Sequence, residues 1–177
     1  MQTALDILRV RWLEERGALT SDLDLAREIL QAGDCRLVIV KEGEVLWQSD
    51  DRMLLGLLAC VDALGTASRG ASMADVVVGK AAALLARAVG VEAVYTPLLS
   101  RRAMDYLRQQ GIRMEYDLLV EGILNLSRND LCPLEHVTVD INDAARALEA
   151  IKDFYARMSL EGPMGEARSD VGSLPSV

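Results

Sequence analysis

Residues 37–47, Leu-Val-Ile-Val-Lys-Glu-Gly-Glu-Val-Leu-Trp, decide the fold more than any other stretch of the chain. Leu37–Val40 is a short run rich in β-branched residues, and Glu42-Gly43 suits a tight turn. Glu44–Trp47 then provides a second strand. The stretch therefore predicts an antiparallel β-hairpin.

Strands and helices alternate downstream of this hairpin. A strand is predicted to begin at residues 93–95, a helix to span 100–110 before Gly111, and a further strand to span 112–120. A strand, a helix and a strand in this order form a parallel unit. Together with the hairpin, this unit predicts an α/β fold with a mixed sheet.

The most apolar helix is predicted to begin at Ser72. Ser72–Asp75 fits the capping-box pattern, with Asp75 in place of the usual glutamate. From Val76 to Ala86 the chain is apolar except for Gly79 and Lys80, so this helix should be central, with Lys80 in its middle. Two further helices are predicted, one from Ser21 or Asp22 to Gly33 and one from about Asp51 to Leu64. A short strand is predicted at Val137–Val139. A last helix is predicted to begin at Asn142 or Asp143, with its apolar side chains facing the core: Leu148, Ile151, Phe154 and Tyr155.

The chain of 177 residues has the length of one domain with short additions. An added N-terminal helix is expected within residues 1–20, because apolar residues recur on one side of a helix over 2–16. The α/β domain should span 21–160. Gly, Pro and Ser dominate residues 161–177, which predicts a disordered tail.

Composition excludes several classes of function. A formal net charge of -8 argues against non-specific nucleic-acid binding and gives no attraction to an anionic membrane surface. The longest apolar stretch, Met53–Val61, is too short to cross a bilayer, and the N-terminus lacks a secretory pattern. Three cysteines make no disulfide framework. We therefore expect a cytoplasmic protein.

Two segments carry a resemblance to a known family. Gly70-Ala-Ser-Met-Ala-Asp-Val-Val-Val-Gly-Lys-Ala-Ala-Ala-Leu84 and Leu131-Cys-Pro-Leu-Glu135 resemble an uncharacterised bacterial and archaeal family, a domain of unknown function with a cytidine-deaminase-like fold. The resemblance covers roughly residues 22–157. It implies a three-layer α/β/α sandwich around a mixed, mainly five-stranded sheet, and it implies no activity.

The residues that hold zinc in deaminases are missing from the corresponding places. Zinc deamination needs three His or Cys ligands and a carboxylate that acts as acid and base. Here no cysteine follows Pro97, His136 is the one histidine, and the cysteines at 35, 60 and 132 form no Cys-x-x-Cys pair. The sequence therefore predicts no metal site, no cofactor and no zinc-dependent deamination.

Cys132 is a candidate catalytic residue. It precedes Pro133, and a thiol at a helix N-terminus can become nucleophilic. Glu135 would oppose this with negative charge, whereas a protonated His136 would help. The alternative is an ordinary buried thiol at a turn.

Hydroxyl and charged groups near the two expected helix starts are candidate ligand-binding residues. Helix N-termini attract anions, so a phosphate or nucleotide-like ligand would fit there. Alternatively, the hydroxyls only cap the helices, and the Lys80 side chain extends past apolar neighbours to solvent. Arg101-Arg102 at the start of a helix would be explained by a partner anion, and the alternative is a solvated surface pair. The candidates are Ser72, Asp75, Lys80, Thr96, Ser100 and Arg101.

Three functions remain open. The first is a non-catalytic deaminase-like domain that binds a small anionic metabolite. The second is an assembly module that uses the N-terminal helix and the sheet edges to bind another subunit. The third is a thiol enzyme with Cys132 as nucleophile. A homo-oligomer is compatible with all three.

Overall fold

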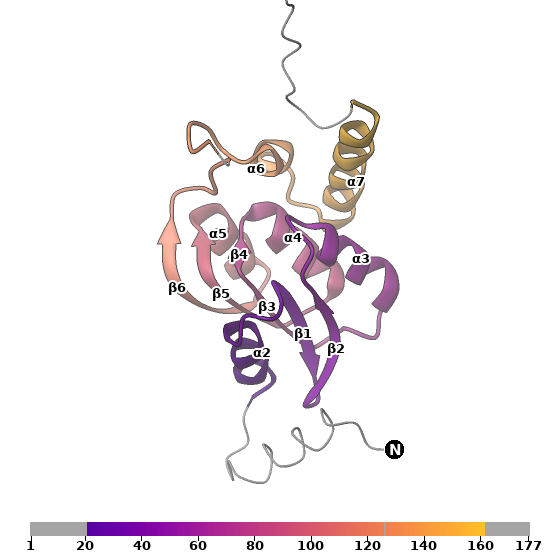
Figure 1. Cartoon of the computed structure of the whole chain (residues 1–177), viewed down its shortest axis with the longest axis vertical. Coiled ribbons are helices and arrows are strands. Elements are labelled where there is room, and N and C mark those ends of the chain that lie inside the picture. Colours follow the sequence, from indigo (N-terminus) through magenta and orange to yellow (C-terminus); the bar gives the residue numbers. More distant parts are fainter. Residues whose placement is uncertain (1–20, 126, 162–177) are drawn as a thin grey trace, which may run out of the picture.

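The computed structural model describes residues 21–125 and 127–161, and the predicted N-terminal helix and tail lie outside this part of the chain (Figure 1). Within it, six helices surround a mixed sheet of six strands. In chain order they are α2 (Asp22–Gln31), β1 (Leu37–Lys41), β2 (Glu44–Ser49), α3 (Leu55–Leu64), β3 (Ser72–Asp75), β4 (Val77–Val78), α4 (Lys80–Val89), β5 (Ala93–Ser100), α5 (Arg101–Gln109), β6 (Arg113–Val120), α6 (Pro133–Thr138) and α7 (Ala144–Glu161).

The predicted hairpin is confirmed. β1 and β2 pair antiparallel and are joined by Glu42 and Gly43, whose φ angles are 52° and 74°. Two successive residues with positive φ make a turn whose twist matches that of the flanking strands. The Asp22 carboxylate accepts hydrogen bonds of 2.8 Å from both of their N–H groups, which ties the turn to the start of α2.

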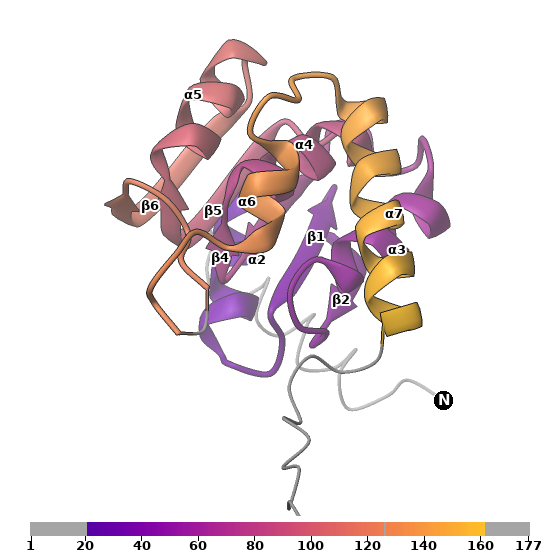
Figure 2. The ribbon, with the colours of Figure 1, turned by 90° about the horizontal axis from the view of Figure 1, so that it is seen from above.

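The sheet combines this hairpin with parallel strands, as predicted. Its order is β2-β1-β3-β5-β4, with β6 also paired to β5. β3 runs antiparallel to β1, whereas β3, β4 and β6 all run parallel to β5. Helix α2 covers one face, and α3, α4, α5 and α7 pack on the other (Figures 1 and 2).

β3 and β4 are two parts of one interrupted strand, which is why the sheet has six strands where the resemblance implied mainly five. Both pair with β5 in one continuous register. The gap lies opposite Pro97, which has no N–H to donate to the ladder. Side chains take over there, because Asp75 Oδ1 accepts from Val77 N (3.3 Å) and Thr96 Oγ1 accepts from Leu98 N (3.2 Å).

The interruption changes which side chains face the main core, the larger of the two clusters of buried apolar side chains. Met73 and Val78 both belong to this core, and so do Val94 and Leu99, although an odd number of positions separates the members of each pair. Regular alternation would place them on opposite faces. Both strands therefore rotate together at the gap. Gly79, which follows β4, and Ser100, the last residue of β5, are the N-caps of α4 and α5.

The helix predicted to begin at Ser72 begins at Lys80 instead, so that prediction was wrong. Ser72–Asp75 is strand β3, which is buried between β1 and β5, and Gly79 is the N-cap of α4. A strand buried on both faces is apolar without alternation and resembles a buried helix in sequence. Lys80 is consequently the first residue of α4 and does not lie in its middle.

Two further boundaries differ from prediction. The predicted strand Val137–Val139 is wrong, because these residues belong to the end of α6 and its C-cap. Pro133 at the first position of α6 favours the helix over a short β-branched run. The helix expected from Asp51 begins at Leu55. Asp143 caps α7 as expected, since its Oδ1 accepts from Arg146 N at 2.8 Å.

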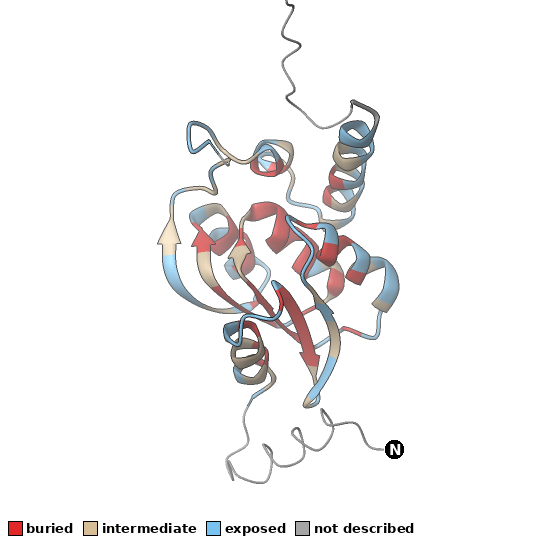
Figure 3. Ribbon diagram, in the orientation of Figure 1, coloured by how far each residue is buried: buried red, intermediate tan, exposed pale blue. Residues whose placement is uncertain are grey.

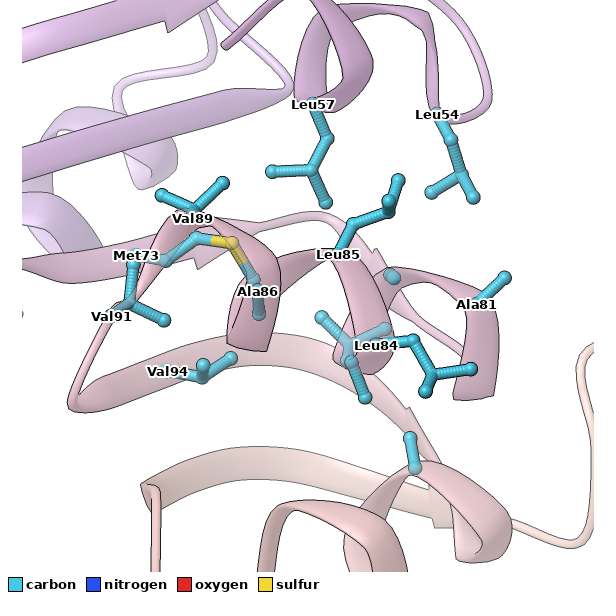
Figure 4. Close-up of a cluster of buried hydrophobic side chains, with 14 of the residues drawn as sticks. Leu54, Leu57, Met73, Ala81, Leu84, Leu85, Ala86, Val89, Val91 and Val94 are labelled. Carbon is cyan, nitrogen blue, oxygen red and sulfur yellow. The ribbon is translucent and has the colours of Figure 1, made fainter. Parts of the chain in front are cut away.

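Burial concentrates on the central strands and on α4 (Figure 3). In the main core, Leu84 and Leu85 of α4 lie against Leu57 of α3 and Val94 of β5 (Figure 4). Full burial of one such side chain contributes roughly 1.5 to 3 kcal/mol. A smaller cluster under α2 covers the other face. Across the described helices, none combines the length and the apolar character that a bilayer crossing needs.

Candidate functional site

A buried carboxylate joins the starts of α4 and α5. Glu135 of α6 is 2% exposed, and its Oε1 accepts from Lys80 N at 2.9 Å and from Ser100 Oγ at 3.3 Å. Lys80 is the first residue of α4, and Ser100 is the N-cap of α5, where its hydroxyl also accepts from Ala103 N. Helix N-termini present free N–H groups and positive dipole ends. The carboxylate therefore lies where two helices favour an anion.

Arg102 provides the positive charge of this site. Its Nη1 lies 3.6 Å from Glu135 Oε2, within ion-pair distance but too far for a hydrogen bond. Both atoms are buried and lack a hydrogen-bond partner among the residues that the structure describes. The Arg102 side chain is 40% exposed, so it reaches the cluster from the surface. The site thus has one donor and one acceptor that are close but unmatched.

Gly79 makes room for the carboxylate. A Cβ atom at this position would lie well inside contact distance of Glu135 Oε1 and 3.0 Å from Ile123 Cγ1. Its backbone is extended, with φ of -89°, so conformational freedom is not the reason for glycine here. The requirement is steric: the Glu135 carboxylate occupies the volume that a side chain would fill.

The Lys80 side chain points away from the carboxylate. Its Nζ donates to Val139 O at 2.6 Å, just after α6. Burial lowers the pKa of Lys80, the charge of Asp140 raises it, and Arg102 lowers it. Lys80 therefore lies at the predicted site, but its backbone N–H, and not its ammonium group, contacts the anion.

Four other predicted residues are not part of this cluster. Ser72 and Thr96 lie within β3 and β5, so their predicted positions at helix starts were wrong. Thr96 and Asp75 bind the local backbone at the strand interruption. Arg101 Nε donates to Glu121 Oε1 at 3.0 Å on the exposed surface. Of the six ligand-binding candidates, only Lys80 and Ser100 meet at one point.

Asp75 is nevertheless an unusual group. Burial raises its pKa from 3.8 to about 7, against the opposing effects of the Val77 N–H, the Arg36 charge and the Val76 N–H. A carboxyl group with such a pKa is protonated in a large fraction of the protein molecules at neutral pH. Its hydrogen bond lies at the strand interruption, so we assign it a structural role.

Cys132 is the N-cap of α6 and is half-buried, and its side chain packs against the main core. His136 Nε2 lies 3.3 Å from Asp130 Oδ1, and the hydrogen bond from the Leu131 N–H, followed by that of the histidine, lowers the pKa of Asp130. Cys35 and Cys60 are buried. Within the described ranges, no group of three or more His, Cys, Asp or Glu residues is arranged to hold a metal ion.

A surface pocket of about 450 Å³ lies elsewhere, between the ends of α4 and α5 and the start of α7. Arg87, Tyr106 and Asp143 are among the residues that line it, and neither Lys80 nor Ser100 is. The pocket therefore does not give access to the buried carboxylate. The anion site is filled by the chain itself.

Sequence reasoning missed the two central residues of the site. Glu135 was predicted as a charge near Cys132, whereas its side chain reaches across to α4 and α5. The signal for Arg102 was present, because two arginines at the head of a helix predicted a partner anion. Glu135 is that anion for Arg102, and Glu121 is the partner of Arg101.

Comparison with known proteins identifies one family. The family model described as a domain of unknown function, DUF1893, matches residues 25–155. The crystal structure of a DUF1893 family protein from Thermotoga maritima is similar, with a TM-score of 0.70 and 20% sequence identity. The similarity covers 77% of this chain and 92% of that one, and at this identity it shows the fold alone. A search of curated proteins finds no match.

Proposed function

Because the chain belongs to the DUF1893 family, whose function is unknown, we propose a function from the geometry of its own residues. The protein is a non-catalytic binding domain for a small anionic, nucleotide-like ligand. The binding site is the point where the starts of α4 and α5 meet.

One observation carries this proposal: the Glu135 carboxylate is held by groups from two different helices. They are the Lys80 N–H, the Ser100 hydroxyl and the Arg102 guanidinium. Backbone N–H groups at helix starts, hydroxyls and arginines are the groups that proteins use to bind phosphates and carboxylates. Glu135 therefore stands in for the anionic part of a ligand.

The topology supports a deaminase-like scaffold for this site. The sheet is mixed, as the resemblance implies, with an antiparallel hairpin at one side followed by parallel strands and their helices. In that fold the two helix starts frame the reaction site. At the starts of α4 and α5 this chain has a carboxylate and an arginine, a pair that favours the binding of an anion over deamination.

The first test removes Glu135 and supplies a carboxylate from solution. Glu135→Ala leaves the donors of α4 and α5 without an acceptor, so the variant should unfold at a lower temperature than wild type. If acetate binds the vacated site with a Kd of about 10 mM, about 100 mM acetate stabilises the variant by roughly 1.4 kcal/mol. That corresponds to a rise of roughly 3 to 6 °C in Tm.

The control keeps ionic strength constant with chloride and adds Arg102→Met to Glu135→Ala. Wild type and the double variant should respond to acetate much less than Glu135→Ala does. Equal responses to acetate and chloride in Glu135→Ala would refute the anion site. For the natural ligand, nucleoside monophosphates and inorganic phosphate should raise the Tm of wild type, and Arg102→Met should abolish that rise.

A specific observation also favours the assembly function. β6 pairs only with β5 among the described strands, and it exposes Tyr116 (40%) and Leu118 (57%). An edge strand with exposed apolar side chains is a template for another chain. Sedimentation of the full chain and of Leu118→Lys tests this: a monomer at all concentrations in the full chain would exclude assembly through β6.

A further inference from the structure

We infer that α6 and its C-cap, residues Pro133–Val139, form a latch over the anion site, which opens when a phosphate group replaces Glu135. The inference rests on the proposed function and adds how the site is closed and which anion it prefers. Figure 2 shows α6 across the ends of β4 and β5, beside the start of α4.

Lys80 attaches the latch at two points, and the Ser100 hydroxyl and Arg102 contact the same Glu135 carboxylate. The Lys80 backbone N–H binds Glu135 Oε1 at 2.9 Å, in the first turn of α6. The Lys80 ammonium binds Val139 O at 2.6 Å, at the C-cap. One residue of α4 therefore contacts both ends of α6, and loss of the carboxylate contacts leaves the bond from the Lys80 ammonium to Val139 O as the polar side-chain contact between α4 and the latch.

The apolar attachment of α6 is small. Among its six residues only Leu134 is a buried hydrophobic side chain, at 4% exposure. The Thr138 hydroxyl bonds Leu134 O within the same helix and so does not tie α6 to the rest of the protein. A short helix with one apolar anchor opens locally at lower free energy than the domain unfolds.

The hydrogen bonds of the site select a phosphate over a carboxylate. Glu135 satisfies Lys80 N and Ser100 Oγ with one oxygen, and its second oxygen stops 3.6 Å short of Arg102 Nη1. That buried N–H has no acceptor among the described residues. A carboxylate has two oxygens, whereas a terminal phosphate has three and also carries more charge to pair with Arg102.

The same charges make closure of the latch by Glu135 and binding of a phosphate mutually exclusive. Glu135 is almost fully buried at the point where the phosphate would lie, and two anions cannot share one buried site without a large repulsion. The phosphate therefore binds only when Glu135 leaves, and α6 moves with it. Glu135 is thus an internal competitor of the ligand.

Cys132 reports the opening. It lies at the N-terminus of α6 and is half-buried, whereas Cys35 and Cys60 are buried. In the full folded chain, its alkylation by a maleimide should be roughly tenfold faster in Glu135→Gln than in wild type, since the amide keeps the shape but loses the charge. Cys132→Ser identifies the signal, and Arg101→Met, whose partner is exposed, is the matched control.

Inorganic phosphate should speed the labelling of wild type at constant ionic strength, and Arg102→Met should remove this effect. Circular dichroism of each variant shows that the fold persists. If Glu135→Gln is labelled at the wild-type rate, or if phosphate leaves the wild-type rate unchanged, the latch is refuted even where acetate stabilises Glu135→Ala. Faster labelling without acetate stabilisation would instead refute the anion site, and the phosphate preference with it.

Discussion

Replacement of Asp75 by Asn is expected to remove a large part of the pH dependence of the unfolding free energy near neutrality. Asp75 is buried at the gap between β3 and β4, and its Oδ1 accepts from Val77 N at 3.3 Å. Burial raises its pKa from 3.8 to about 7. Asparagine retains the acceptor oxygen and has no charge to bury, so it mimics the protonated acid.

The sign and size follow from proton linkage. Between these two pKa values the folded protein binds one proton more than the unfolded chain, so stability falls as pH rises. The slope is ~1.4 kcal/mol per pH unit, and it disappears above the folded pKa. From about pH 5 to about pH 7.5, wild type should therefore lose roughly 2 to 3 kcal/mol more than Asp75→Asn does.

Urea unfolding followed by tryptophan fluorescence at a series of pH values measures this difference directly. Other titrating groups contribute equally to both proteins and cancel. Two parallel curves of free energy against pH would refute the reasoning, because they would mean that Asp75 ionises in the folded protein as easily as in the unfolded chain. Wild type that gains stability relative to the variant as pH rises would contradict even the sign.

Three further predictions concern single contacts. Gly79→Ala should displace Glu135 and destabilise the protein by roughly 1.5 to 3 kcal/mol. This loss of stability should vanish in a Glu135→Ala background, and an equal loss in both backgrounds would exclude a clash between the new Cβ atom and Glu135. Tyr155→Phe removes the hydroxyl that accepts from Leu54 N at 3.1 Å, so a loss of about 1 to 2 kcal/mol in thermal unfolding is expected, and no loss would mean that solvent satisfies this N–H. Arg27→Met removes a guanidinium 4.3 Å from a buried tyrosine ring; about 1 kcal/mol should be lost in urea unfolding, and a high-salt series should reduce the difference.

The hairpin, the parallel strand-helix-strand unit and the cap of the last helix were predictable, because local residues specify them. Glu42-Gly43 can adopt the two positive φ angles that the turn needs, and Asp143 supplies a side-chain acceptor at the start of α7. Each of these features depends on residues that are close in the chain. The mixed α/β fold followed from their order.

The region from Ser72 to Lys80 could not be predicted in the same way. Ser72–Asp75 fits a helix cap and also a buried strand, and only pairing with β1 and β5 decides between them. The interruption depends on Pro97, which lies in another strand. The true start of α4 at Gly79 is marked by close packing against Glu135, a contact between residues far apart in the chain.

In the candidate site, too, the feature set by local sequence was predictable and the contacts between distant residues were not. Ser100 was identified from its local position at a helix start, and it does cap α5. Glu135 was assigned to its own neighbours, Cys132 and His136, because distance along the chain is the only distance that a sequence gives. Its actual partners come from α4 and α5.

Why this scaffold needs an anion follows from its geometry. Gly79, after β4, and Ser100, at the end of β5, are the N-caps of α4 and α5, and both helix starts contact the Glu135 carboxylate. Two positive dipole ends and the buried Nη1 of Arg102 meet at this point, and Glu135 supplies the compensating negative charge. Its unmatched Oε2 and the unmatched Arg102 N–H indicate that Glu135 compensates the charge without completing the hydrogen bonds, which leaves a better-fitting anion a free-energy advantage over it.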